Sequence, residues 1–466
     1  MAERLPGMAP SGRDFTLPAE AYWSNHDRLT GIDVRDTVDR MATGRGAGRP
    51  PAWGDLLVPV QVPEPTRFRL TLRQGWLDPL ALMNFKILPS RPDMDVTSEA
   101  FAQHPVGSGP YVYDAGVRGD NGRECVAFKA NPYYGARPGK SGLPRIEEIH
   151  FIDYKDPVAE FAPSKLGRLD LALDLTAKEA VNLKAKAADL DITAPAPAAP
   201  NRRIYFLAVN HRKPTLANAA FRCALAYAVN REKILDDDFR ATPGQPHAAL
   251  NGPYPVRSWA ANPDPKYRHK YLGRDTLDPF DPAAAKAKKD ESRVGDTTLS
   301  LKYSSGDPAV EKAMQQLAIQ VKDALGVTLT PEAEPADALR HDVEETHAYD
   351  LAYYHYDFPD DVYWLGPLLD TRGGPDGNYL GYAGGDKDDL IPLLKDESRQ
   401  RDFPQVREWA HELHARFLAE EMPFIPLWQL DPLAAIHNDV VPPTSDPSFD
   451  PLLVFTDVEL WKLNRK

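Results

Sequence analysis

The sequence has little cysteine, no long apolar run and an excess of negative over positive charge. Its two cysteines, Cys125 and Cys223, do not have the spacing of metal ligands, and we predict neither a metal-binding module nor a disulfide. No apolar run approaches the roughly 18 residues that a membrane span needs. The net charge of −13 argues against non-specific binding to nucleic acid or to anionic membranes.

The remaining composition is that of a globular protein with a sizeable core. The chain has 466 residues, of which 42% are hydrophobic, which is enough for two or three domains. Its 45 prolines are spread along the chain and indicate many ordered loops. The first fifteen residues contain no basic segment followed by an apolar one, so they carry no recognisable secretory signal.

The most regular stretch of the chain covers residues 205–235. Residues 205–209 are aromatic or apolar and predict a strand, and Pro214 argues against a helix directly after it. Asn218 can accept hydrogen bonds from the first turn of a helix, and Asn230 is a second candidate cap. Between these caps, apolar residues at helical spacing predict one buried helix face: Phe221, Ala224, Leu225 and Ala228.

Other helices are predicted from caps and periodicity. Thr30 can cap a helix, with Asp33 three residues later, and another helix should begin near Thr176. Amphipathic spacing predicts helices over residues 309–325 and 404–420.

The helix over residues 404–420 carries a histidine pair, His411 and His414, at positions i and i+3. Such a pair could bind a metal. It falls off the apolar face of the helix and lacks a third ligand, so a metal site is the weaker interpretation.

The most aromatic segment of the chain, residues 349–369, contains the closely spaced carboxylates Asp357, Asp360 and Asp361. One interpretation is a strand-to-helix corner with solvated acids. The other is the wall of a binding pocket, in which aromatic faces contact a ligand and a carboxylate binds a cation.

Several residues and segments, taken in chain order, match the pattern of one protein family: Trp23, Ser24, Thr30, Asp33, Val34, Gly107, Gly109–Tyr111, Asn131–Tyr134, Phe221–Ile234, Phe280–Pro282, Asp357, Pro359, Asp360 and Glu421–Trp428. In these residues the chain resembles the family 5 extracellular solute-binding proteins, which are oligopeptide-, dipeptide- and nickel-binding receptors of ABC importers. The family usually has Asp-Gly where this chain has Asn25 and His26, Thr where it has Ser108, and Tyr and Pro where it has Phe358 and Asp361.

The resemblance implies an α/β fold of the two-lobed periplasmic-binding-protein type (type II, similar to cluster C), with a hinge between the lobes. The chain should cross between lobes near Leu207–Asn210 and Leu427–Asp431. The expected parts are residues 1–147 as an N-terminal subdomain of lobe I with a shortened start, 148–207 and 431–466 as the lobe I core, and 208–430 as lobe II.

The resemblance also implies a function. The protein should capture peptides, or a related small solute, in a cleft between the lobes and deliver them to ABC permease and ATPase subunits. We expect a monomer that is neither an enzyme nor membrane-spanning, needs no cofactor, binds no nucleic acid and works in the periplasm or elsewhere outside the cytoplasmic membrane. The alternatives are a glycosidase-like enzyme that uses Asp357, Asp360 and Asp361, and a binding remnant without a transport role.

Within this resemblance Asp357 is the expected charged anchor, because the corresponding family residue binds the α-amino group of a peptide. No lysine or arginine lies within ten residues of Asp357 in sequence, so an ammonium group of the ligand is its expected partner. The remaining residues that we expect to contact the solute are Tyr354, His355, Tyr356, Trp364, Asn378 and Asn210.

Overall fold

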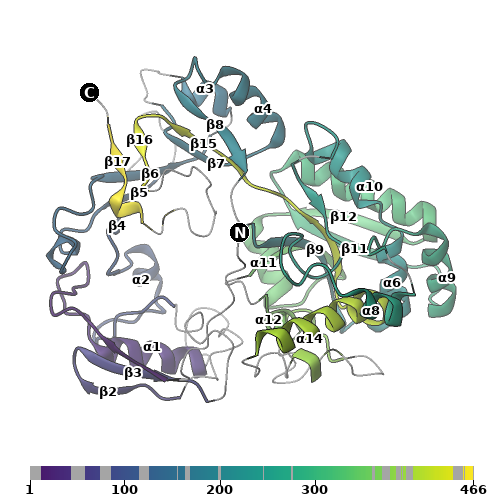
Figure 1. Cartoon of the computed structure of the whole chain (residues 1–466), viewed down its shortest axis with the longest axis horizontal. Helices are drawn as coiled ribbons and strands as arrows, with labels where there is room; N and C mark the ends of the chain where they lie inside the picture. The colour runs from purple at the N-terminus through teal and green to yellow at the C-terminus, as the bar shows by residue number, and fades with distance from the viewer. Residues whose placement is uncertain are drawn as a thin grey trace. The chain divides into compact units, whose positions relative to one another are not determined.

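The computed structural model divides into two compact units (Figure 1). Of the described residues, those from 201 to 431 form one unit, here called the central unit, and the others form the terminal unit. The structure describes residues 12–43, 58–73, 85–114, 125–154, 156–162, 168–197, 201–244, 246–273, 276–358, 363–369, 378–384, 390, 392–394, 402–443, 455 and 457–464.

The central unit is built on one six-stranded sheet with the order β10-β14-β9-β13-β11-β12. Strand β9 (Arg203–Val209) lies inside this sheet and pairs antiparallel with β13 on one side and with β14 on the other. Strand β11 pairs in parallel with both β12 and β13. The other strands are β10 (Ala248–Ala249), β11 (Thr298–Ser304), β12 (Thr328–Glu334), β13 (Leu351–Asp357) and β14 (Ile425–Gln429).

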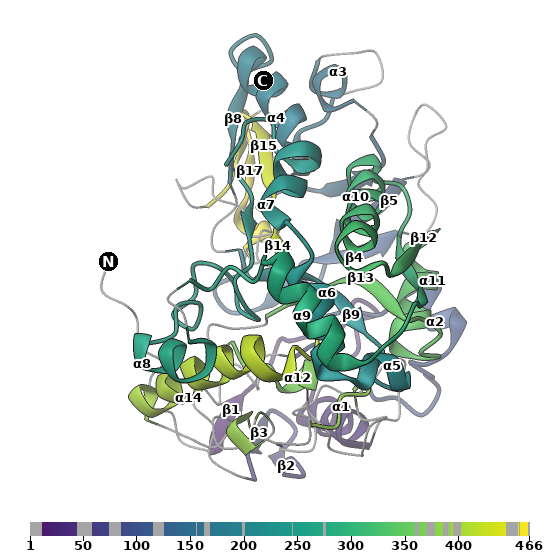
Figure 2. The same ribbon diagram turned by 90° about the vertical axis from the view of Figure 1, so that its right-hand side faces the viewer.

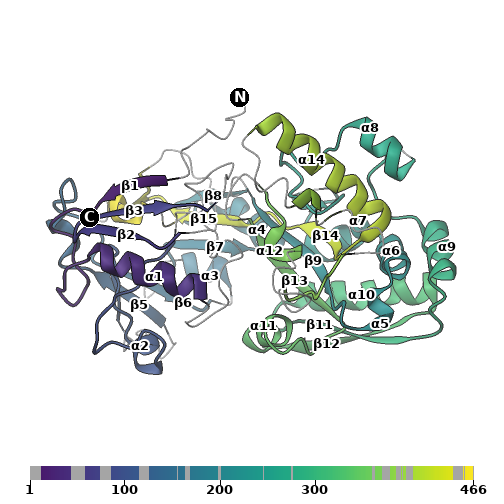
Figure 3. The ribbon, with the colours of Figure 1, turned by 90° about the horizontal axis from the view of Figure 1, so that it is seen from below.

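Helices pack around this sheet and against one another. Helix α10 contacts β11 and β12, and α6 contacts both α9 and α10 (Figures 2 and 3). The helices are α5 (Pro214–Ala217), α6 (Ala219–Tyr227), α7 (Arg231–Ile234), α8 (Pro265–Tyr267), α9 (Pro282–Ser292), α10 (Pro308–Leu325), α11 (Ala336–Glu344), α12 (Gly366–Leu369) and α14 (Phe403–Arg416), with π-helical turns η4 (Leu235–Phe239), η5 (Arg268–Leu272) and η7 (Phe417–Glu421).

The local signals in residues 205–235 are largely confirmed. The side chain of Asn218 accepts from the N–H of Phe221, and that of Asn230 accepts from the N–H of Lys233, as helix caps do. The expectation for Pro214 is wrong. It begins the short helix α5, because a proline in the first turn lacks only an N–H that would have no helical partner.

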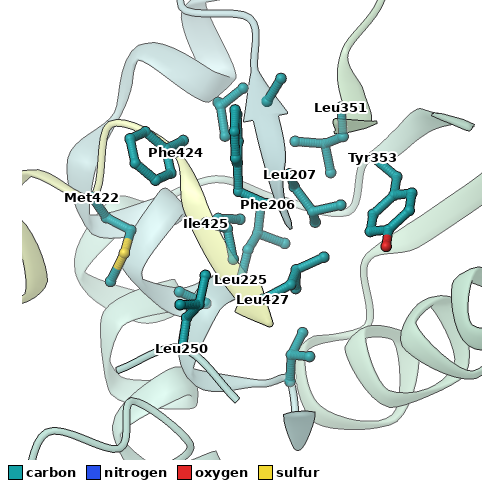
Figure 4. Close-up of a cluster of buried hydrophobic side chains, with 14 of the residues drawn as sticks. Phe206, Leu207, Leu225, Leu250, Leu351, Tyr353, Met422, Phe424, Ile425 and Leu427 are labelled. Carbon is teal, nitrogen blue, oxygen red and sulfur yellow. The ribbon is translucent and has the colours of Figure 1, made fainter. Parts of the chain in front are cut away.

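Helix α6 is buried on all sides, although its spacing predicted a single buried face. It packs against β9 and β14 in the main apolar core, where the side chains of Phe206, Leu225 and Ile425 are almost inaccessible (Figure 4). A helix enclosed in this way has no polar face, so any charged residue on it must find partners inside the protein.

Two arginines of this segment are buried and donate to main-chain carbonyls. Nη1 of Arg222 donates to the oxygens of Leu216 and Ala217 at 3.0 and 2.7 Å, and its Nε donates to that of Met422 at 3.0 Å. Nε of Arg231 donates to the oxygen of Pro426 at 2.6 Å. Burial lowers the pKa of Arg231 to about 10, so it remains charged at neutral pH. These two side chains join the helices after β9 to the segment that contains β14.

In the described part of the terminal unit the strands form four small sheets, with the orders β1-β3-β2, β4-β5-β6, β7-β15-β8 and β16-β17. Helix α1 contacts β2, and α4 contacts β7, β8 and β15 (Figure 1). Its strands are β1 (Gly12–Thr16), β2 (Gln61–Glu64), β3 (Arg67–Thr71), β4 (Tyr111–Asp114), β5 (Cys125–Ala130), β6 (Glu148–Ile152), β7 (Leu171–Leu175), β8 (Ile192–Pro197), β15 (Leu433–His437), β16 (Val440–Val441) and β17 (Lys462–Leu463).

The cap predicted at Thr176 is complete, and that predicted at Thr30 is present in part. The main-chain N–H of Thr30 donates to Oδ2 of Asp33 at 2.7 Å, and Thr176 forms a complete capping box with Glu179. The helices are α1 (Gly31–Thr43), α2 (Glu99–Gln103), α3 (Pro157–Phe161) and α4 (Ala177–Lys186), with 3₁₀ turns η3 (Tyr134–Ala136) and η8 (Val458–Leu460).

The division between the units falls after residue 200 and again after residue 431. The first position differs from the crossing expected near Leu207–Asn210, because β9 pairs along its whole length within the sheet of the central unit. Nδ2 of Asn201 donates to the carbonyl oxygen of Leu430 at 2.8 Å and to Oδ1 of Asp431 at 3.1 Å. The two ends of the central unit are therefore bonded to each other. The roles of these parts as receptor lobes stay a prediction.

Replacing Arg222 with methionine should strongly destabilise the central unit. The substitution keeps much of the side-chain length but leaves several buried carbonyl groups without their donor, and it removes the guanidinium that lies 3.8 Å from the buried carboxylate of Glu421. We expect the free energy of unfolding to fall by about 3–5 kcal/mol. Urea unfolding followed by circular dichroism measures the change.

Lys233→Met is the matched control, because Lys233 lies in the same segment and pairs with Asp237 at the surface. Its effect should stay below about 1 kcal/mol. Equal effects of the two substitutions would contradict the role given to Arg222.

Candidate functional site

The candidate site lies on the C-terminal half of β13, where it pairs with β9. Opposite residues of an antiparallel pair share one face of the sheet. The register places Tyr205 opposite His355 and Arg203 opposite Asp357. The neighbouring pair towards the core joins Leu207 and Tyr353. His355 and Asp357, which were expected in the site from sequence, therefore share a face with Arg203 and Tyr205. These last two residues were not expected there.

Aromatic rings cover this face next to the charged residues. The rings of Tyr205 and Tyr353 stack with centroids 5.4 Å apart and planes 12° apart, and His355 lies 5.8 Å from Tyr205. Nε1 of Trp428 donates to the hydroxyl oxygen of Tyr353 at 2.9 Å. Tyr353 and Trp428 are buried, whereas His355 is exposed and Tyr205 partly so. The accessible part of the aromatic face is thus Tyr205 and His355.

Asp357 forms an ion pair with Arg203. Nε and Nη2 of the guanidinium donate to the two carboxylate oxygens at 2.6 and 3.0 Å, in a bidentate arrangement. Burial is the largest single influence and lowers the pKa of Arg203, but the hydrogen bonds and charge interactions with Asp357 and Tyr205 together outweigh it, so the net pKa is raised. The expectation that Asp357 has no cationic partner in the chain is therefore wrong. The partner lies on the neighbouring strand, outside the ten residues considered on either side.

His355 lies beside this ion pair. Its Nε2 is 3.7 Å from Oδ2 of Asp357. Burial and then the positive charge of Arg203 lower the pKa of His355 below its ordinary value of 6.5. At neutral pH the imidazole is therefore uncharged, and the Arg203–Asp357 pair is the main source of charge on this face.

The two tyrosines predicted for the site alternate onto the other face of β13. The hydroxyl of Tyr354 donates to Oε1 of Glu344 at 2.6 Å, and burial together with this bond raises the pKa of Tyr354. Its ring also approaches that of His355, with centroids 5.7 Å apart. Tyr356 packs edge-on against Phe358 at 5.0 Å. This arrangement does not favour a direct role for Tyr356 beside Asp357.

The two predicted asparagines are buried and hold main-chain groups. Nδ2 of Asn210 donates to the carbonyl oxygens of His347 and Tyr349 at 3.0 and 2.8 Å. Asn378 exchanges two hydrogen bonds with the main chain of Tyr382. Each of these asparagines is only 1% exposed, so both stabilise the loops around β13.

Trp364 packs against the main apolar core and also takes part in a smaller cluster. It packs with Trp259 against Phe403 and Val406. A Cβ atom on Gly366 would lie 2.0 Å from the Trp364 ring, so only glycine allows this close approach. Asp360 and Asp361, the other carboxylates of the glycosidase interpretation, lie outside the described residues.

The histidine pair of α14 is buried, which corrects the expectation that it falls off the buried face. The ring nitrogens of His414 lie 3.1 and 2.9 Å from the carbonyl oxygens of Ala260 and Asn251, and Nε2 of His411 lies 3.1 Å from that of Trp259. Burial lowers the pKa of His414 to about 4. Among the described residues no group of histidine, cysteine and carboxylate side chains could hold a metal ion.

The signal for Arg203 and Tyr205 was present in the sequence but incomplete. Residues 205–209 read clearly as a strand, and alternation would place residues 203, 205 and 207 on one face. What the sequence did not show is that β13 pairs with this strand in the register that joins Arg203 to Asp357.

Comparison with known protein families shows which family the chain belongs to. The model for bacterial extracellular solute-binding proteins, family 5 (middle part), matches residues 2–376. The chain belongs to this family. No curated protein matches it.

Solved structures agree with the family 5 assignment at the level of the fold. The oligopeptide-binding protein AppA of Bacillus subtilis, in complex with a nonapeptide, is 17% identical, with a TM-score of 0.77 and coverage of 99% of this chain and 90% of that one. The murein tripeptide-binding protein MppA of Escherichia coli is 16% identical, with a TM-score of 0.77 and coverage of 99% and 89%. NikZ of Campylobacter jejuni, in complex with Ni(L-His), is 18% identical, with a TM-score of 0.72 and coverage of 98% and 90%.

These findings confirm the two-lobed α/β fold and the family expected from sequence. The chain is therefore a solute-binding protein, as the other members of its family are. Among the described residues, no helix is both long enough and apolar enough to cross a membrane.

Acid should destabilise this family 5 protein through its buried histidines. Burial lowers the pKa of His211 to about 3 and those of His247 and His414 to about 4, below the unfolded value of about 6.5. The unfolded chain then binds more protons, so stability is lost as pH falls from about 6.5 towards 4. Each histidine should contribute a slope of up to about 1.4 kcal/mol per pH unit.

Urea unfolding at several pH values measures this slope. His414→Gln should reduce the slope of unfolding free energy against pH by the contribution of one histidine. His104→Gln is the control, because His104 is exposed and its replacement should leave the slope unchanged. A slope in His414→Gln identical to that of the parent would show that His414 is not buried in its neutral form.

Proposed function

We propose that this protein is the receptor of an ABC importer and captures a peptide or a related small solute for membrane permease and ATPase subunits. The observation that carries the proposal is the family match over residues 2–376. It is supported by solved structures of the same fold in complex with a nonapeptide and with Ni(L-His). We further propose that it acts as a monomer in the periplasm or elsewhere outside the cytoplasmic membrane.

Within this proposal, the solute contacts the accessible face of β13. Tyr205 and His355 supply ring surface there, and Arg203 and Asp357 supply hydrogen-bond donors and acceptors. Aromatic faces beside a few polar groups are the usual lining of a small-solute site. Tyr354 contributes at the edge through its contact with His355.

The glycosidase alternative is weaker. It requires one carboxyl group as a proton donor and a second as a base or nucleophile. Both oxygens of Asp357 accept hydrogen bonds from Arg203, which favours a role as an ion-pair partner over a role as a proton donor. We therefore propose that the protein binds its solute without converting it.

Solute binding should be stoichiometric and should depend on the β13 face. A thermal-shift screen of peptides and nickel chelates, followed by calorimetric titration, should give one solute per chain, and the solute should be recovered unchanged. Tyr205→Leu should weaken binding by about two- to tenfold, because an aromatic contact contributes about 0.5–1.5 kcal/mol.

Ile319→Ala is the control for this test, because Ile319 is exposed on α10, away from β13 in sequence. Its binding constant should equal that of the parent. Conversion of the solute, or full affinity in Tyr205→Leu, would contradict the assigned site.

The importer role can be tested in cells of the source organism. Deleting the gene should abolish uptake of the labelled solute, and restoring it should recover uptake. Fractionation should find the protein outside the cytoplasmic membrane. Undiminished uptake after deletion, or protein found only in the cytosol, would overturn this part of the proposal.

A further inference from the structure

The Arg203–Asp357 ion pair affects which chemical groups of a solute the candidate site can bind. Its side chains are 33% and 24% exposed, so solvent and a solute can reach the pair. The guanidinium uses Nε and Nη2 towards the carboxylate, and each carboxylate oxygen accepts one of these bonds. An arginine has five N–H donors and a carboxylate about four acceptor positions, so both groups keep further hydrogen-bonding capacity.

The pair carries no net charge. A carboxylate without a partner favours an ammonium group, because the ligand then supplies the missing cation. Here the chain supplies that cation, and an ammonium approaching Asp357 also approaches the like charge of Arg203. Among the described residues, titratable groups near His355 and the pair include Tyr205 on β9, Tyr353 and Tyr354 on β13, and Glu344 on α11.

We infer that Arg203 is a specificity-determining residue, which neutralises Asp357 so that the site selects solutes presenting an uncharged amide rather than a terminal ammonium. This inference rests on the proposed function. A secondary amide carries a donor and an acceptor close together, which suits the acceptors left on Asp357 and the donors left on Arg203. Tyr205 and His355 lie beside the pair and can contact the apolar part of such a solute.

A measurement without ligand tests the neutralisation itself. In Arg203→Gln, His355 loses a positive neighbour and faces an uncompensated carboxylate. Its pKa, followed by NMR and assigned with His355→Gln, should therefore rise by about one unit or more. Lys213→Gln is the matched control, because Lys213 pairs with Asp350 at the other end of the same two strands. An unchanged pKa of His355 in Arg203→Gln would overturn the inference.

The selectivity is tested with one peptide in two forms, with a free and an acetylated amino terminus, taken from the thermal-shift screen. By calorimetry the parent should bind the acetylated form at least as tightly as the free form. Arg203→Gln should prefer the free form by about tenfold, since Asp357 then lacks its cation. Arg203→Lys keeps the charge and should keep the selectivity of the parent, as should Lys213→Gln.

The outcomes separate this inference from the proposed function. If the parent prefers the free form by about tenfold and Arg203→Gln shows the same preference, the inference is overturned. The receptor function would not be affected by that result. Failure of both forms to bind either protein would overturn the proposed peptide class and the inference with it. Melting temperatures of the variants show whether each is folded under the conditions of the titration.

Discussion

The central unit depends on the hydrogen bonding of β9 along both of its edges. This strand pairs with β13 and with β14, so its main-chain groups are satisfied inside the sheet and its apolar side chains enter the core. The same seven residues also supply Arg203 and Tyr205 to the candidate site. A change that moved β9 by one residue would turn both side chains to the other face of the sheet.

The segment after β9 stabilises this arrangement through buried charge. Arg222 and Arg231 each bond main-chain oxygens near β14, about two hundred residues away in sequence. A buried guanidinium is costly to desolvate, and here carbonyl oxygens compensate for that cost. The most recognisable family segment of the sequence, Phe221–Ile234, therefore specifies packing inside one unit rather than contact with a solute.

Local features could be predicted from sequence because they depend on neighbouring residues. The strand of β9, the Asn218 and Asn230 caps and the amphipathic helix α10 all follow from short-range patterns. The site was only partly predictable. Arg203 and Asp357 are 154 residues apart and meet through strand register, which periodicity does not reveal. Asn210 was expected to contact the solute, but its side chain bonds the main chain.

The most direct test of this account is a crystal structure of the protein with its best-binding solute. The account predicts that the solute contacts Tyr205 and His355 on β13 while the Arg203–Asp357 bonds remain near 2.6 and 3.0 Å. An uncharged group of the solute should then lie against the pair. A structure in which Arg203 has left Asp357 and a ligand ammonium has replaced it, or in which the solute binds away from β13, would contradict the account.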